Sequence, residues 1–152
     1  MKYITGNLLE SKAKALVNAV NTVGVMGKGI ALQFKKRFPL NFKLYAAACK
    51  KGEVKIGKMF VAQESDLQGD KVIINFPIKT DWFKKSDYEY VEEGLKDLVR
   101  VIEAYKIESI AIPALGCGHG GLNWARVKAM LEQYLGDLPH IQIEIFEPST
   151  DQ

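Results

Sequence analysis

Residues 14–34 of the chain read KALVNAVNTVGVMGKGIALQF. The first five form a short apolar run that predicts a buried strand. Apolar side chains then recur at helical spacing from Ile30 to Phe38, and we expect Pro39 to end that helix. The loop between them, Asn18 to Gly29, carries three glycines. Because glycine lets backbone amides approach a phosphate and a helix start adds partial positive charge, this strand–loop–helix unit predicts an anion site.

The rest of the chain repeats this alternation of apolar runs and helical segments. Further strands are predicted at residues 58–62, 71–76, 109–113 and 142–146. A helix over 88–105 is expected to begin with a capping box of Ser86 and Glu89, and another over 123–135 to end at Gly136. Such alternation indicates an α/β fold, with a largely parallel sheet covered by helices on both faces. Ligands of such sheets bind beyond the carboxyl ends of the strands, where the glycine-rich loops fall.

Length and composition exclude several classes of protein. At 152 residues the chain has the size of one domain, and we expect residues 1–152 to form it. With 47% hydrophobic and 26% charged residues it is a folded chain rather than a disordered one. Two cysteines cannot build a disulfide framework, and no run approaches the roughly 18 apolar residues of a membrane span. Because its start has no apolar signal segment, we expect a cytoplasmic protein that does not contact a membrane.

Positive charge is concentrated in one segment. The net charge of the chain is +3, whereas the segment from Lys35 to Lys58 has eight basic residues and one acid, Glu53. That segment therefore carries +7 and the remainder of the chain −4. Such asymmetry indicates either a surface for nucleic acid or a solvated, lysine-rich helix face. If the surface binds nucleic acid, we expect the contacts to include Lys50, Lys51 and Lys55.

A second glycine-rich loop, PALGCGHGGL at residues 113–122, also lies between a predicted strand and a predicted helix. Gly116, Gly118 and Gly121 match the GxGxxG spacing of dinucleotide-binding loops. In a Rossmann fold, this fingerprint lies at the start of a βαβαβ half that binds one mononucleotide. Only about thirty residues follow it here, so the context argues against a Rossmann site. The loop is either an amide-rich cradle for a diphosphate or an ordinary tight turn, and the presence of two such loops favours the cradle.

Lys79 follows a predicted buried strand and has Lys84 and Lys85 nearby in the sequence. A lysine in this position is either solvent-exposed or desolvated, and desolvation lowers its pKa and makes the amine a usable nucleophile. Trp82 and Phe83 beside these lysines either stack on exposed bases or pack as a surface turn. If they stack on bases, we expect Trp82, Lys84 and Lys85 to contact nucleic acid.

Cys117 is an alternative nucleophile, because His119 lies two residues away in the same loop. Proximity in sequence does not establish the geometry that a thiolate nucleophile needs. The cysteine and histidine residues of the chain also lack the spacing of a zinc site. We expect neither a metal nor a cofactor.

Four segments together resemble the macrodomain family, and within it the DarG antitoxin macrodomains of the terminal-ADP-ribose-glycohydrolase-like branch. They are residues 6–9 (GNLL), 16–34, 75–79 (NFPIK) and 113–124. The similarity runs from about Met1 to Phe146. It implies a three-layer α/β/α fold with a central mixed sheet that binds ADP-ribose. It also implies removal of ADP-ribose from a base of single-stranded DNA, which would reverse the action of a DarT-type toxin.

The resemblance also implies roles for particular residues. Asn7 and Leu8 would meet the adenine edge, Phe146 would lie near the adenine, and Lys79 would be the catalytic lysine. The first glycine loop would hold the distal ribose through Asn21, Thr22, Gly27, Lys28 and Gly29. The second would wrap the diphosphate through Gly116, Cys117, Gly118, His119, Gly120 and Gly121.

The chain departs from the family at several points. Many macrodomains have Asp in place of Asn7, and relatives that act on protein-linked ADP-ribose have Asp in place of Gly120. DarG antitoxins carry a further C-terminal domain that 152 residues cannot hold, so we expect either an excised domain or a stand-alone relative. Three functions stay open: a hydrolase of ADP-ribosylated DNA or, alternatively, of protein-linked ADP-ribose; a non-catalytic ADP-ribose reader; and a nicotinamide-cofactor oxidoreductase. Lys79 favours a DNA hydrolase, because a reader has no need of an amine at the distal ribose.

Overall fold

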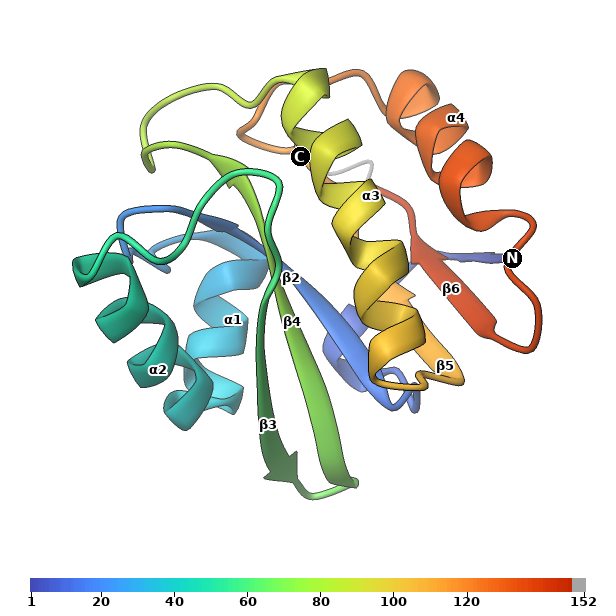
Figure 1. Ribbon diagram of the computed structural model, residues 1–152, viewed down its shortest axis with the longest axis horizontal. Helices are drawn as coiled ribbons and strands as arrows, with labels where there is room; N and C mark the ends of the chain where they lie inside the picture. Colours follow the sequence, from blue (N-terminus) through green and yellow to red (C-terminus); the bar gives the residue numbers. More distant parts are fainter. Residues whose placement is uncertain (149–152) are drawn as a thin grey trace.

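The computed structural model describes residues 1–148, which form one sheet with helices on both sides (Figure 1). The six strands are β1 (Lys2–Ile4), β2 (Ala15–Asn21), β3 (Phe60–Asp66), β4 (Gly69–Lys79), β5 (Ser109–Ile112) and β6 (Gln142–Phe146). Their order across the sheet is β1-β6-β5-β2-β4-β3. Strands β3 and β4 pair antiparallel, and the other neighbouring pairs are parallel. The predicted mixed, largely parallel sheet is confirmed.

Helices cover both faces of this sheet. They are α1 (Gly29–Arg37), α2 (Pro39–Lys50), α3 (Tyr88–Ala104) and α4 (Trp124–Leu135), with a short 3-10 turn, η1, at Leu8–Glu10. Helices α3 and α4 pack on one face, and α1 and α2 pack on the other (Figure 1). The predicted three-layer α/β/α arrangement is therefore confirmed. Within residues 1–148, no helix combines the length and the apolar character that crossing a bilayer requires.

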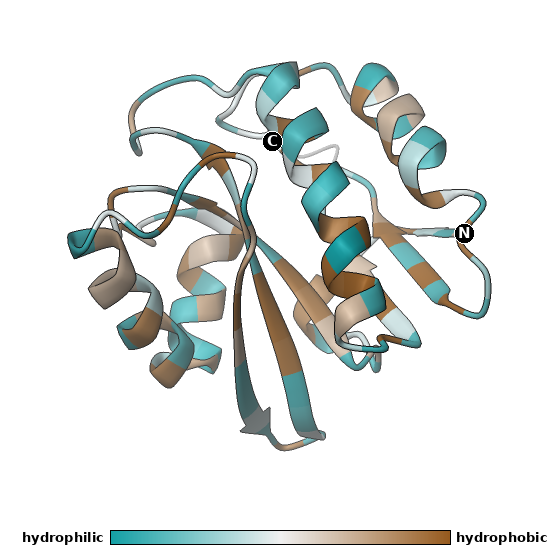
Figure 2. Cartoon of the chain, in the orientation of Figure 1, coloured by the Kyte–Doolittle hydropathy of each residue, from teal (hydrophilic) through white to brown (hydrophobic). Residues whose placement is uncertain are grey.

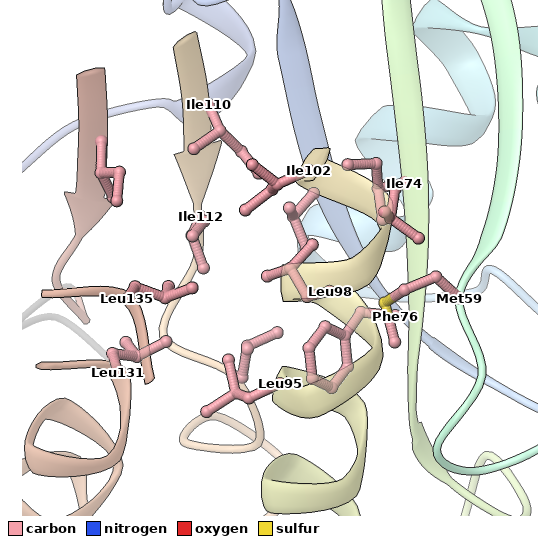
Figure 3. Packing of buried hydrophobic residues seen from close by; sticks show 14 of the residues in the cluster. Met59, Ile74, Phe76, Leu95, Leu98, Ile102, Ile110, Ile112, Leu131 and Leu135 are labelled. Atoms are coloured by element: carbon pink, nitrogen blue, oxygen red, sulfur yellow. The ribbon is translucent and has the colours of Figure 1, made fainter. Parts of the chain in front are cut away.

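Alternating side chains of the strands supply a core to each face. Ala15 and Val17 of β2 pack in the cluster beneath α3 and α4, whereas Leu16 between them packs with Phe34 of α1. Figure 3 shows the first of these clusters, in which Phe76 of β4 meets apolar side chains of α3. Brown, hydrophobic residues predominate in the central part of the sheet, whereas teal, hydrophilic residues appear on the helices and toward the far ends of β3 and β4 (Figure 2). Fully burying one such large side chain contributes about 1.5–3 kcal/mol, so this packing fixes the layers.

Pro39 does more than end the first helix. It is the first residue of α2, and Phe38 serves as the cap between α1 and α2. Proline suits the first position of a helix because the backbone N–H that it lacks would have no partner within the helix there. The sequence pattern predicted only the end of α1 at this point and did not indicate α2.

The predicted capping box at the start of α3 is wrong. Asp87 is the N-cap, and its carboxylate accepts a hydrogen bond from the Glu89 amide at 3.0 Å. The Ser86 hydroxyl instead donates to the carbonyl of Ile78, at 2.6 Å. Ser86 therefore connects the start of α3 to the end of β4. The other predicted helix ends as expected, with Gly136 as the cap of α4.

A crevice lies between β2 and β5, which are parallel neighbours at the centre of the sheet. The chain that leaves β2 enters α1 on one face, and the chain that leaves β5 enters α4 on the other. Both glycine-rich loops therefore begin at the same edge of the sheet and diverge from it. Such a switch point is where α/β sheets bind their ligands.

Candidate functional site

A cleft of about 1290 Å³ opens at this edge of the sheet, and Lys79 lies in its wall. The predicted ADP-ribose contacts that line it are Asn7, Leu8, Asn21, Gly27, Lys28, Gly29, Gly116, Gly118, His119, Gly120 and Phe146. Trp82 and Lys85, predicted to contact nucleic acid, line it as well. The other predicted site residues do not line the cleft; they are Thr22, Cys117, Gly121, Lys84, Lys50, Lys51 and Lys55.

The side chain of Asn21 holds the first glycine loop in shape. Its Nδ2 donates to the Val25 carbonyl at 2.7 Å, and its Oδ1 accepts from the Val23 amide at 3.0 Å. From α2, the Tyr45 hydroxyl lies 2.7 Å from the Asn21 carbonyl and 2.9 Å from Oδ1. Asn21 therefore shapes the loop, and helix α2, which the sequence analysis missed, supports it from behind. The ribose contact of Asn21 stays a prediction.

Thr22 fastens the end of β4 beside the end of β2. Its amide donates to the Lys79 carbonyl at 3.1 Å, and its hydroxyl donates to the Thr80 carbonyl at 2.7 Å. The hydroxyl thus donates its hydrogen bond just past the end of β4, and Thr22 itself lies outside the cleft wall. Its ADP-ribose contact stays a prediction. We interpret Thr22 as a positioning residue for Lys79.

Lys79 is the last residue of β4. Burial lowers the pKa of its amine below the ordinary lysine value, and the positive charges of Lys85 and Lys28 lower the pKa further. A lowered pKa leaves more of the amine neutral near pH 7, and the neutral amine is the nucleophilic form. Lys79 therefore has the electrostatic setting that a lysine nucleophile requires.

The second glycine loop is too tightly folded for side chains at two positions. A Cβ at Gly120 would lie 2.4 Å from the carbonyl oxygen of Gly116. At Gly116, where φ is +74°, a Cβ would lie 2.6 Å from the Leu122 side chain. The Ser86 amide also donates to the Gly120 carbonyl, at 3.0 Å. Through its bond to Ile78, Ser86 therefore ties this loop to the end of β4.

Cys117 lacks the properties of a nucleophile. Its side chain packs against the core beneath α3 and α4, and its Sγ lies 3.5 Å from the Leu115 carbonyl. Burial raises the pKa of the thiol to about 11, so the thiolate is scarce at neutral pH. The alternative of a catalytic Cys117 is not supported. Within residues 1–148, no group of three or more histidine, cysteine or acidic side chains gathers as metal ligands.

The residues that follow β1 and β6 wall another part of the cleft. Phe146 is buried but reaches the cleft wall, and Asn7 caps η1 by accepting from the Leu9 amide at 3.0 Å. Glu147 lines the cleft beside them and accepts from the Trp124 indole at 3.2 Å. The sequence analysis missed Glu147, because a lone acid after the last strand gives no recognisable signal.

A comparison of the sequence with known families decides the classification. The chain matches the macro domain model over residues 17–131. It belongs to the macro domain family. In this macrodomain, the loop with GxGxxG spacing follows β5, the fifth of the six strands along the chain, and so does not begin a Rossmann unit.

Relatives of this macrodomain include both solved structures and curated proteins. The structure titled macrodomain of Mycobacterium tuberculosis DarG has a TM-score of 0.94 and 51% identity, covering 97% of each chain. A structure of Thermosipho africanus DarTG in complex with ADP-ribose has a TM-score of 0.91 and 35% identity, covering 99% of this chain and 42% of that one. A curated Thermus aquaticus protein named DNA ADP-ribosyl glycohydrolase is 49% identical, covering 97% of this chain and 41% of the relative. The chain thus spans about two fifths of the length of that relative.

Proposed function

We propose that this macrodomain binds ADP-ribose in the cleft and hydrolyses it from a modified base of single-stranded DNA. The observation that carries the proposal is a lysine with a lowered pKa, Lys79, in a cleft also lined by two glycine-rich loops. Relatives named DNA ADP-ribosyl glycohydrolase, about half identical to this chain, support the DNA substrate.

The chemistry proposed for the cleft depends on positioning. The loops hold the diphosphate and the distal ribose so that the anomeric carbon lies at the Lys79 amine, which makes the reaction effectively unimolecular. In one route, the neutral Lys79 amine attacks the anomeric carbon while the bond between that carbon and the base nitrogen breaks. The base leaves with the proton that the amine loses. Water then hydrolyses the lysyl adduct and releases ADP-ribose. In the other, the amine assists opening of the ribose ring. Both routes add one water overall and leave an unmodified base.

Such an enzyme would oppose a DarT-type toxin that attaches ADP-ribose to DNA. The solved DarTG relative, whose title names a complex with ADP-ribose, supports both the ligand and this partner. Because the reaction needs access to DNA, we propose that it takes place in the cytoplasm.

The proposal is tested by incubating the protein with an ADP-ribosylated single-stranded oligonucleotide and following the appearance of unmodified oligonucleotide. We expect release of free ADP-ribose with the wild-type chain. Tight ADP-ribose binding without release would instead establish a reader. Faster release from an ADP-ribosylated acidic peptide than from DNA would establish a hydrolase of protein-linked ADP-ribose. Calorimetry that shows binding of NAD but not of ADP-ribose would favour the oxidoreductase alternative.

After burial, the charge of Lys85 is the next largest cause of the lowered Lys79 pKa, and it therefore contributes to the pH dependence that we expect. Lys85→Gln removes a positive charge that lowers the pKa of Lys79, so this pKa rises. The neutral amine is the reacting form, hence kcat increases as pH rises through the Lys79 pKa. The kcat profile of the variant should therefore move to higher pH and reach the same plateau. The measurement is kcat against pH at saturating modified DNA. An unmoved profile would show that the Lys85 charge does not lower the pKa of the group that titrates in the reaction.

A further inference from the structure

Two exposed aromatic side chains stand at the cleft three and four residues after Lys79. Trp82 is 55% exposed and Phe83 is 64% exposed, and both line the same cleft as the lysine. Their rings meet edge to face, with centroids 5.5 Å apart. Single exposed apolar residues are common, but a contiguous exposed apolar patch at the wall of a cleft is a feature of interaction sites.

The segment that presents this pair is fixed by hydrogen bonds at both ends. The Thr80 carbonyl accepts from the hydroxyl of Thr22, and the Ser86 hydroxyl donates to the carbonyl of Ile78. Between these points, the side chain of Asp81 accepts from the Trp82 amide at 2.7 Å. The rings are therefore held out on a constrained turn, which lowers the entropy that a partner must overcome on binding.

Charge around the pair is positive. Of the titratable lysine and acidic side chains that line the cleft, three are lysines, Lys28, Lys79 and Lys85, and one is an acid, Glu147. Outside the cleft wall, Lys84 adds an exposed positive charge beside Phe83 and Asp81 a negative charge beside Trp82, so the lysines still outnumber the acids around the pair. Aromatic faces combined with lysines are the features that hold single-stranded nucleic acid, because bases stack on the rings while phosphates meet the charges.

We propose that Trp82 and Phe83 form a stacking platform for the bases next to the modified nucleotide, and that Lys84 and Lys85 contact the adjoining phosphates. The inference rests on the proposed function and adds where the DNA strand is held. If Lys79 acts at the anomeric carbon, then the nucleotide lies beyond the bond that breaks. The segment directly after Lys79 carries the two rings and lines the cleft. It therefore lies beside the residue that we place at the bond to the DNA base.

The test measures binding in a Lys79→Ala background, so that the substrate is not consumed. Affinities for free ADP-ribose and for an ADP-ribosylated single-stranded oligonucleotide are compared with and without Trp82→Ala/Phe83→Ala. We expect the double substitution to weaken oligonucleotide binding at least about tenfold, because stacking on aromatic side chains contributes substantially per base. ADP-ribose affinity should change less than about twofold, and Trp82→Phe, which keeps a stacking face, should retain most of the oligonucleotide affinity. The matched control is Leu67→Ala, an exposed apolar residue in the turn between β3 and β4, where we expect no effect.

The role of Lys84 at the phosphates is tested separately through salt. Lys84→Glu should weaken oligonucleotide binding and flatten its dependence on salt by about 0.7 in log–log slope for each phosphate that the lysine neutralises. Lys12→Glu, a reversal at an exposed lysine that precedes β2, is the control and should leave the slope unchanged. Equal slopes for Lys84→Glu and wild type would overturn the assignment of Lys84 to a phosphate.

Three outcomes would overturn the stacking platform: unchanged oligonucleotide affinity in the double variant, an equal loss for free ADP-ribose, or an equal loss for an ADP-ribosylated peptide. Failure of the proposed function looks different. A wild-type protein that releases ADP-ribose from DNA while the double variant binds the oligonucleotide normally refutes the platform alone. A wild-type protein that releases nothing while the double variant loses oligonucleotide affinity refutes the activity alone and supports the platform.

Discussion

Lys79→Ala should slow the release of ADP-ribose from modified DNA by at least about 100-fold, because it removes the amine that acts at the anomeric carbon. ADP-ribose affinity should stay within a few-fold of wild type. We expect this separation because we assign ADP-ribose binding mainly to the two glycine loops and the segments around the ends of β1 and β6, which line the cleft, whereas the proposed role of the amine is where bonds change. Single-turnover release and calorimetry with ADP-ribose measure the two quantities independently.

Lys79→Arg distinguishes a nucleophile from a fixed charge. A guanidinium keeps the positive charge but does not lose its proton, so this variant should be nearly as inactive as Lys79→Ala. An arginine variant that keeps most of the rate would show that the charge alone is needed. An alanine variant that keeps most of the rate would mean that Lys79 is not catalytic, and would leave the reader as the better proposal.

Gly120→Val should reduce ADP-ribose affinity by more than tenfold, which corresponds to about 1.4 kcal/mol. The reason is steric: a Cβ at this position would lie 2.4 Å from the Gly116 carbonyl oxygen, so the second loop must open. The backbone amides that we expect to meet the diphosphate would then move apart. Calorimetry with ADP-ribose is the measurement, accompanied by thermal unfolding to show that the variant is folded.

Gly52→Val is a matched control for this effect. Gly52 has a positive φ, +71°, so a side chain there strains the backbone, but its Cβ would meet no atom within 4 Å and the residue lies outside the cleft wall. Backbone strain at Gly52 should therefore lower stability without changing ADP-ribose affinity. Normal affinity in a folded Gly120→Val variant would remove the second loop from the binding site.

The sequence predicted most of the sheet because its central strands are continuous apolar runs. It missed β1, since three residues that are at least partly exposed carry almost no hydrophobic pattern. Helix α2 was missed for a different reason, namely that Pro39 ends one helix and begins the next. Both errors arise where a local signal is ambiguous and packing decides the outcome.

The position of the cleft was more predictable than the direction of individual side chains. Glycine-rich loops that follow neighbouring parallel strands must share one edge of the sheet, which places both loops at the cleft. Whether a side chain within a loop faces the cleft depends on tertiary hydrogen bonds and packing. The Thr22 hydroxyl is engaged by Thr80, and Cys117 is turned toward the core, and neither outcome is encoded in loop composition.

Ser86 has a consequence for how the protein fluctuates. With its hydroxyl on Ile78 and its amide on Gly120, this one residue belongs to the segment that carries Lys79 and to the second glycine loop. Local unfolding of either segment would break a hydrogen bond of Ser86, the residue that connects the two segments. We therefore expect them to unfold together as one cooperative unit in native-state hydrogen exchange. A ligand that contacts only the second glycine loop would then also protect the backbone amides around Lys79 from exchange. In this way the diphosphate, which does not react, would help to order the lysine that does.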